Sequence, residues 1–347
     1  MDFHYFGRLK RGLSVVAESP LEEVWSTVRR YATKEMLETY IYAGGELTKE
    51  DVVNYCRARF RQTSEFRETG RTSTLVTKPL TLYYSILNLT RAVVVLRTDR
   101  PIEGGHGLGK FQTNTDLLAC SVKTSETGTF PALWRMYTDS GAIPESITLR
   151  DCLSQIPEVM WSFNSPLRGP SLCTSVELEL FSAGKAILSF PNGPRPVEVF
   201  EKEWKSWFPK LATLNSALEV TPAGKIRLVC PEMLVTRQDA KADQDRVAAF
   251  SANYLISDLS SLATSTFYLV RNTPGVPVLR RELAYLGAMH ILSSVVRYEP
   301  EALLHAIESS SELAWFLDKV LQAVERYYPQ LLLSLAESRD IYFVHAD

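Results

Sequence analysis

The chain has 347 residues, which is more than one small hydrophobic core organises and enough for two structural units. Its composition, 45% hydrophobic and 22% charged residues, is that of an ordinary globular protein and excludes a largely disordered chain. The formal net charge of −2 gives no general reason to expect a polyanionic partner, although the 38 Lys and Arg residues are enough for a local basic patch.

The cysteines and the N-terminus indicate a cytoplasmic protein. No two of the five cysteines have the close spacing of a thiolate zinc site, so we expect reduced thiols, no metal and no cofactor. The N-terminus lacks the apolar segment of a secretory signal. No run approaches the roughly 20 apolar residues that a membrane span requires, so we expect no membrane partner.

The first predicted helices begin at capping signals. Ser19 stands directly before Pro20 and is followed by acidic residues, a pattern typical of a helix N-terminus. Thr48 marks a second start of the same kind. The third helix, Lys78–Ala92, is apolar nearly all round and is therefore expected to be central and buried, although Val93–Val95 favour an early end.

Beyond the third helix the pattern changes twice. Residues 101–130 contain several glycines and few periodic apolar positions, which predicts an ordered but irregular loop. Alternating apolar and polar residues then predict antiparallel strands at 174–181, 185–190, 225–230 and 266–270. After residue 276 the chain becomes helical again, and Pro329 is expected to end a helix that begins at Ser311.

These patterns predict an α+β fold with a mostly helical core from both chain ends and a small antiparallel β-layer from the middle. We expect three regions: an N-terminal helical region at 1–170, a β-rich region at 171–275, and a C-terminal helical region at 276–347. The C-terminal helices are expected to pack on the N-terminal ones.

Three stretches together resemble the YaaC-like family of uncharacterised bacterial proteins. They are the helix Lys78–Ala92, the short element His106–Leu108, and the segment Leu292–Pro300. Arg91 stands where the family usually has a lysine near the end of the helix. The resemblance implies a shared fold and a bacterial cytosolic setting, and it implies no reaction.

The glycine-rich segment Gly104–Lys110 has the spacing of a phosphate-binding P-loop. A P-loop also needs a strand before it, a helix after it and a Ser or Thr after the lysine, where this chain has Phe111. We therefore interpret the segment as a glycine-rich turn that fits closely over the helical core.

Arg100 and His106 have the spacing found in HEPN-type ribonucleases, which are helical bundles. In such sites the histidine acts in general acid–base catalysis on the proton of the attacking 2′-hydroxyl, and the arginine stabilises the charge of the phosphorane. The alternative is a structural histidine whose ring bonds a buried carbonyl. Arg100 and His106 are thus candidate catalytic residues only if the protein is a ribonuclease.

Arg297, Tyr298 and His305 form a further candidate group, in which Arg297 lies at a predicted helix end. A cation there stabilises the helix dipole, and this structural role is the simpler interpretation. If Arg297 instead points into a cleft beside His106, it becomes a ligand for an anion or an RNA phosphate. The candidate binding residues are Asn88, Arg91, Lys110, Arg297 and Tyr298.

Two functional hypotheses follow. The first is a non-catalytic binding or regulatory protein in a bacterial cytosolic assembly, with stress or antiviral defence as a suggested setting and a protein partner or a second copy as its partner. The alternative is a HEPN-like ribonuclease or RNA-binding protein that uses Arg100 and His106. Exposure of His106 in a cleft that Arg297 also reaches would favour the alternative.

Overall fold

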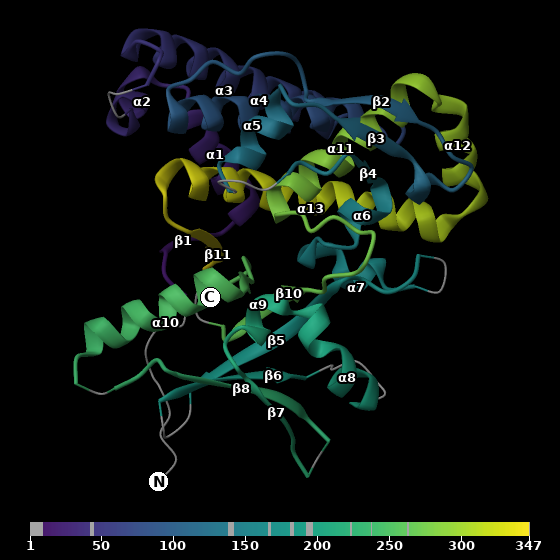
Figure 1. Cartoon of the computed structure of the whole chain (residues 1–347). Coiled ribbons are helices and arrows are strands. Elements are labelled where there is room, and N and C mark those ends of the chain that lie inside the picture. The colour runs from purple at the N-terminus through teal and green to yellow at the C-terminus, as the bar shows by residue number, and fades with distance from the viewer. Residues whose placement is uncertain are drawn as a thin grey trace. The chain divides into compact units, whose positions relative to one another are not determined.

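The computed structural model describes residues 10–41, 45–137, 142–165, 168–180, 184–191, 197–222, 224–236, 238–261 and 264–346. The chain forms two compact units. The sheet unit contains residues 171–278 and the segment before Val15, and the helical unit contains 15–170 and 279–347. Helices predominate and every named strand pair given a register is antiparallel, so the chain has the predicted α+β fold (Figure 1).

The helical unit is built from both parts of the chain. Its helices are α1 (Pro20–Arg30), α2 (Lys34–Tyr40), α3 (Lys49–Arg71), α4 (Lys78–Thr98), α5 (Thr129–Arg135), α6 (Leu149–Leu153), α7 (Met160–Phe163), α11 (Arg281–Tyr298), α12 (Pro300–Ser309) and α13 (Ser311–Glu337). Two 3-10 turns, η1 (Leu117–Ala119) and η2 (Pro157–Val159), lie between them.

Helix α4 is the centre of this unit, because it packs against α3, α11 and α13 (Figure 1). The β-branched residues Val93–Val95 do not end it early; they are buried, and packing on three neighbours outweighs their weak helix propensity. The helix is long and apolar enough to cross a membrane by composition, but 78% of its most apolar window is buried inside the protein. Helix α4 is therefore a core helix of this unit.

Local capping explains where two of the helices begin. The Ser19 side chain accepts a hydrogen bond from the backbone N–H of Glu22 at 3.5 Å, and Thr48 accepts one from Asp51 at 3.1 Å. Each bond satisfies one of the N–H groups that a helix leaves without a partner at its start. Both helix starts that the sequence predicts are therefore present.

The predicted helix end at Pro329 is wrong, because α13 continues through this residue to Glu337. A proline inside a helix removes the N–H that would bond the carbonyl four residues earlier, which here belongs to Glu325. In this structure the indole N–H of Trp25, on α1, donates to that carbonyl at 3.0 Å. A side-chain donor on another helix thus supplies the hydrogen bond to the Glu325 carbonyl that the proline cannot make.

The expected irregular loop at 101–130 also needs correction. It contains β2 (Leu108–Gln112), η1 and β3 (Ser121–Thr124), and β3 pairs with β4 (Ser146–Thr148) to complete a three-stranded sheet. These strands have three to five residues, and β2 pairs irregularly with β3. Strands this short do not produce a recognisable alternation in the sequence.

The sheet unit contains a six-stranded antiparallel sheet in the order β7-β8-β6-β5-β10-β9. Its elements are β5 (Cys173–Leu180), β6 (Lys185–Phe190), α8 (Val197–Trp207), α9 (Pro209–Ala212), β7 (Ala217–Val220), β8 (Ile226–Met233), α10 (Ala240–Tyr254), β9 (Ile256–Ser257) and β10 (Thr266–Val270). The four predicted strands correspond to β5, β6, β8 and β10. Residue 181, the last of the predicted strand 174–181, and residues 182–183 after it lie outside the described residues.

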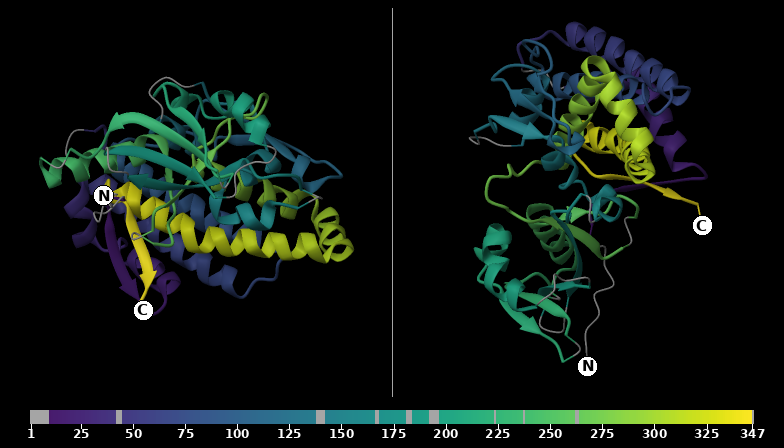
Figure 2. Two further views of the ribbon diagram at one scale, coloured as in Figure 1. Left: turned by 90° about the horizontal axis from the view of Figure 1, so that it is seen from below. Right: turned by 90° about the vertical axis from the view of Figure 1, so that its right-hand side faces the viewer.

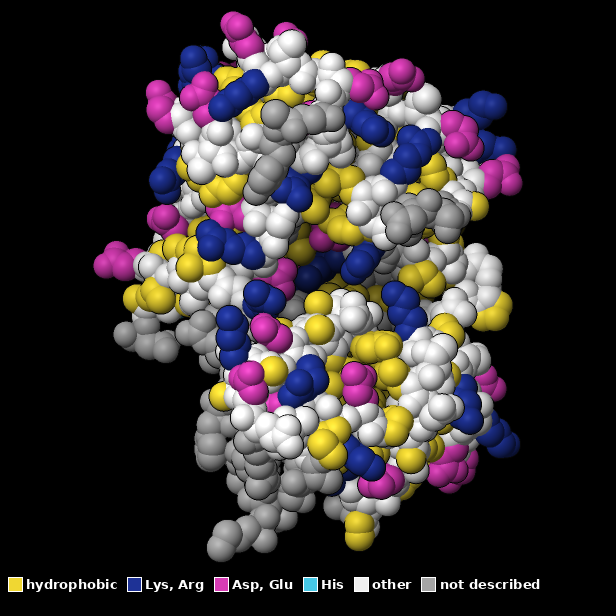
Figure 3. Space-filling model, turned by 60° about the vertical axis from the view of Figure 1, so that its left-hand side comes forward, with side chains coloured by type: hydrophobic (Ala, Val, Ile, Leu, Met, Phe, Trp, Pro, Cys, Tyr) yellow, Lys and Arg dark blue, Asp and Glu magenta, His cyan; other side chains and the backbone are white. Residues whose placement is uncertain are grey.

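The buried faces of these strands form the core of the sheet unit together with aromatic residues from α8. Near the chain termini, β1 (Leu13–Ala17) and β11 (Ile341–His345) form a separate two-stranded sheet and lie side by side in Figure 2. Lys and Arg side chains occur among Asp and Glu side chains over the face drawn in Figure 3, in keeping with the nearly balanced net charge.

Candidate functional site

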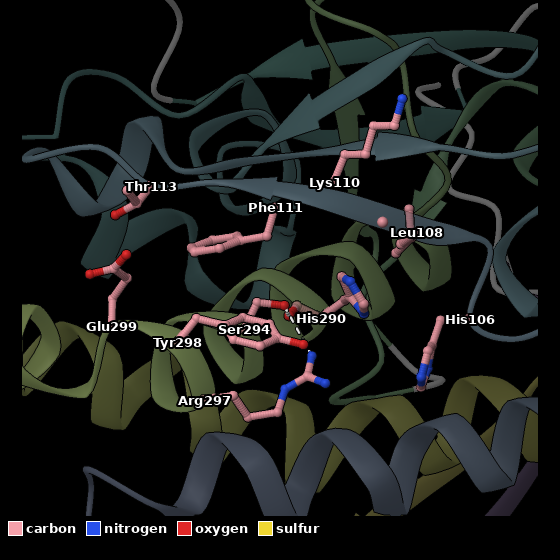
Figure 4. A pocket seen from close by; sticks show the side chains of 11 residues that line it. His106, Leu108, Lys110, Phe111, Thr113, His290, Ser294, Arg297, Tyr298 and Glu299 are labelled. Atoms are coloured by element: carbon pink, nitrogen blue, oxygen red, sulfur yellow. Dashed lines mark hydrogen bonds between the residues drawn. The ribbon is translucent and has the colours of Figure 1, made fainter.

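A cavity of about 440 Å³ lies in the helical unit, between the C-terminal half of α11 and strand β2, with His106 just before that strand. This volume is within the range of small-molecule sites, roughly 300–1,000 Å³. Figure 4 shows the lining side chains. Its polar lining includes His106, Lys110, Thr113, His290, Ser294, Arg297 and Glu299. Parts of the chain that are far apart in sequence therefore build one site.

Glycines fix the loop that carries His106. Gly107 has a φ of +77°, and a Cβ added there would lie 2.2 Å from Cδ of Pro131, so only glycine fits. The backbone N–H of Phe130 donates to the His106 carbonyl at 2.9 Å. The loop continues into strand β2 and not into a helix, so it lacks the helix N-terminus of a P-loop. It is a close-fitting turn that positions the histidine.

A buried tyrosine joins the two histidines of the cavity. The hydroxyl of Tyr83, on α4, lies 2.6 Å from Nδ1 of His106 and 2.8 Å from Nδ1 of His290. Tyr83 is 1% exposed and His290 is 4% exposed, whereas His106 is partly exposed. Nε2 of each histidine has no hydrogen-bond partner among the described residues. These two nitrogens are therefore available to a ligand.

Burial and nearby cations keep this cluster uncharged. Desolvation lowers the pKa of His290 to about 3, with smaller contributions from His106 and Arg297. Desolvation also lowers the pKa of His106, and Arg297 and Arg91 act in the same direction. Burial raises the pKa of Tyr83 above its usual value. Both imidazoles are consequently neutral near pH 7, and the phenol keeps its proton.

Arg297 is held by the last turns of α11. Its Nε donates to the Ser293 carbonyl at 3.2 Å, and its Nη2 donates to Oγ of Ser294 at 3.1 Å. The guanidinium also lies over the ring of Tyr298, 5.0 Å from the ring centroid. These contacts leave further N–H groups of the guanidinium for a ligand.

The charge of the cavity is mainly positive. Neither Arg297 nor Lys110 has an ion-pair partner among the described residues, and Glu299 is the acidic residue among those that line the cavity. In Figure 4 the Arg297 guanidinium extends toward the side where His106 lies, whereas Lys110 points away from it. Arg297 is therefore the cation that faces the histidines.

The residues singled out from the sequence do not all meet here. His106, Lys110, Arg297 and Tyr298 line the cavity. Arg100 does not line it, and its side chain, 70% exposed, pairs with Glu46 at 3.6 Å. Among the described residues, the hydrogen-bond partner of the His106 ring is the Tyr83 hydroxyl and not the buried carbonyl of the structural alternative.

Asn88 and Arg91 lie on α4 but contact α3 and do not line the cavity. Oδ1 of Asn88 accepts a hydrogen bond from Nη1 of Arg59 at 2.7 Å, and Nε of Arg91 donates to the Tyr55 hydroxyl at 3.0 Å. Arg91 still lowers the pKa of His106 through its charge.

Tyr83 and His290 were missed as site residues in the sequence. His290 stands within the apolar helix α11, where all residues from Leu283 to Val295 are buried, and an isolated ionisable residue in such a run is an available signal. Tyr83 gives no such signal, because tyrosine is common in buried helices. The contact between them joins positions 207 residues apart.

Taken together, fold and site define an α+β protein in which α11 and the segment around β2 enclose a small, histidine-lined cavity that also contains Arg297. A sequence model of the family described as YaaC-like Protein matches residues 26–336, and the chain belongs to that family. No curated protein matches the chain, and no solved structure matches it.

Proposed function

We propose that the protein is a binding or regulatory protein whose cavity takes the anionic oxygens of a phosphoryl or carboxylate group. The observation that carries this proposal is the meeting of His106, His290 and Arg297 in one cavity, where no carboxylate of the described residues is paired with them. The action of such a protein in a bacterial cytosolic assembly stays a prediction of the sequence.

The physical argument rests on Arg297. A guanidinium presents planar N–H groups that match two oxygens of a carboxylate or phosphate, and such charge-assisted bonds are stronger than neutral ones. The serines that hold Arg297 reduce the side-chain entropy lost on binding. The neutral histidines add hydrogen-bonding capacity without adding a charge that burial would penalise.

Calorimetric titration with inorganic phosphate tests the proposal. A hydrogen bond to a charged group contributes about 1.5–3 kcal/mol, so Arg297→Gln should weaken binding about tenfold or more. Arg100→Gln is the matched control, because it removes the same charge from an exposed side chain outside the cavity. No phosphate binding by the wild type, or equal losses in both variants, would refute the proposed site.

A ribonuclease is the second candidate, favoured by the partly exposed His106 in the same cavity as Arg297. A neutral imidazole with a free Nε2 suits a general base near pH 7. Because Arg100 pairs with Glu46 outside the cavity, the arginine of this candidate is Arg297.

Cleavage of a mixed set of labelled RNAs tests this candidate. We expect cleavage by the wild type to be lost in a folded His106→Ala variant and in Arg297→Gln, and to persist in Arg100→Gln. Absence of cleavage by the wild type eliminates the candidate and leaves the binding protein.

A further inference from the structure

The three polar groups Nδ1 of His106, the Tyr83 hydroxyl and Nδ1 of His290 form a short chain of two hydrogen bonds. Each contact needs one hydrogen between its two atoms. The phenol has a single hydrogen and can donate it to only one histidine. The other histidine must then supply the second hydrogen from its own Nδ1.

This count fixes the two rings in opposite tautomers. Each neutral imidazole carries one N–H, on either Nδ1 or Nε2. The ring that donates from Nδ1 has a bare Nε2, and the ring that accepts at Nδ1 carries its hydrogen on Nε2. The free Nε2 atoms of His106 and His290 are therefore one hydrogen-bond acceptor and one donor, whichever ring has which role.

We propose that this donor–acceptor pair makes the cavity selective for a tetrahedral oxyanion that carries a proton, such as phosphate, over one that carries none, such as sulfate. The inference rests on the proposed anion site and names the ligand of that site. Phosphate and sulfate have nearly the same size and shape, so the proton is the feature that distinguishes them.

The groups of a phosphate match those of the cavity. One P–OH donates to the bare Nε2, one oxygen accepts from the Nε2–H of the other histidine, and another accepts from Arg297. Sulfate near pH 7 has no hydrogen to donate, so it leaves the bare nitrogen facing an anionic oxygen. Leaving this buried polar group unpaired weakens sulfate binding, so we expect a preference for phosphate of about tenfold or more.

The cavity has room for more than a phosphate. Phe111 and Tyr298 stack at its other side, with ring centroids 6.3 Å apart, and Tyr298 is exposed. A phosphomonoester in its monoanionic form carries the same P–OH and could place a flat organic group on these rings. Free phosphate and a phosphomonoester thus share the recognised chemistry.

Binding of phosphate and sulfate to the wild type and to Tyr83→Phe tests the selectivity. Phe keeps the packing of the ring and removes only the hydroxyl, and an unchanged melting temperature checks the fold. We expect the wild type to prefer phosphate about tenfold or more. In Tyr83→Phe both rings are free to carry their hydrogen on Nε2, so sulfate should bind better and the preference should fall toward one.

Nitrogen-15 NMR of the histidine rings gives a readout that needs no ligand. We expect one Nδ1–H and one Nε2–H tautomer for His106 and His290 in the wild type, and loss of this pairing in Tyr83→Phe. Identical tautomers, or equal binding of sulfate and phosphate by the wild type, would overturn the proposal. If neither anion binds, the proposed anion site fails and the selectivity with it, while opposite tautomers would still verify the hydrogen-bond order.

Adenosine monophosphate distinguishes the two sources of the phosphate group. Near pH 6 about half of a phosphomonoester carries the proton that the site requires. Tighter binding than that of inorganic phosphate at the same pH would assign the ligand as a phosphomonoester whose organic part contacts Phe111 and Tyr298. Weaker binding would assign free phosphate.

Discussion

Replacing Trp25 by Phe removes a hydrogen bond that Pro329 makes necessary. The indole N–H donates to the Glu325 carbonyl, which has lost its helical partner because residue 329 is a proline. Trp25 is completely buried, so no water replaces the lost donor. The carbonyl of Glu325 would then be left without a partner in the core.

The magnitude follows from two contributions. An unsatisfied buried carbonyl costs about 1–3 kcal/mol, and the smaller phenyl ring adds a packing loss of about 1 kcal/mol. We therefore expect Trp25→Phe to lower the free energy of unfolding by about 2–4 kcal/mol. In a Pro329→Ala background the alanine N–H bonds the same carbonyl, so only the packing loss remains. The coupling between the two substitutions should be about 1–3 kcal/mol.

Urea unfolding of the wild type, both single variants and the double variant measures this coupling. Linear extrapolation of the helical circular dichroism signal gives the four free energies. Additive effects, within about 0.5 kcal/mol, would refute the claim that Trp25 replaces the bond deleted by the proline.

Three further predictions concern pH, thiols and the glycine-rich loop. Because the pKa of His290 falls from 6.5 to about 3 on folding, the unfolded chain binds a proton that the folded chain does not. The free energy of unfolding should therefore decrease as pH falls below about 6.5, by up to about 1.4 kcal/mol per pH unit. In acid unfolding, His290→Gln should make this decrease with pH less steep. All five cysteines are buried, so a thiol reagent should modify them rapidly only in urea, and fast reaction of the native protein would contradict the core assignment. Gly107→Ala should clearly lower the melting temperature, because the added Cβ would overlap Pro131. Gly105→Ala should change the melting temperature little, because the space around its Cβ is open. Equal effects of the two substitutions would contradict the account of the loop.

Much of the fold was predictable because its signals are local. The capping serine and threonine at residues 19 and 48 mark helix starts, and the alternating residues of β5, β6, β8 and β10 mark strands. Pro329 misled the prediction because its local preference is overridden by a donor from Trp25, 300 residues away in sequence. The short strands β2 and β3 were not predicted, because each forms only by pairing with its neighbouring strands.

The site was predictable only in part. His106 stands out in the sequence because it lies in a glycine-rich segment, and Arg297 stands out because it lies at a predicted helix end. Their meeting in one cavity depends on how α11 packs against α4. Spacing along the chain suggested Arg100 as the partner of His106, whereas the fold directs that side chain to Glu46. The link through Tyr83 follows from tertiary packing, because neither its position nor its residue type distinguishes it in the sequence.

The most direct measurement is a phosphate titration followed by nitrogen-15 NMR of the histidine rings. The account predicts that the Nε2 signals of His106 and His290 shift with added phosphate, while those of His305, an exposed residue on α12 that does not line the cavity, stay in place. Shifts at His305 with none at His106 and His290 would contradict the assignment of the cavity as the anion site.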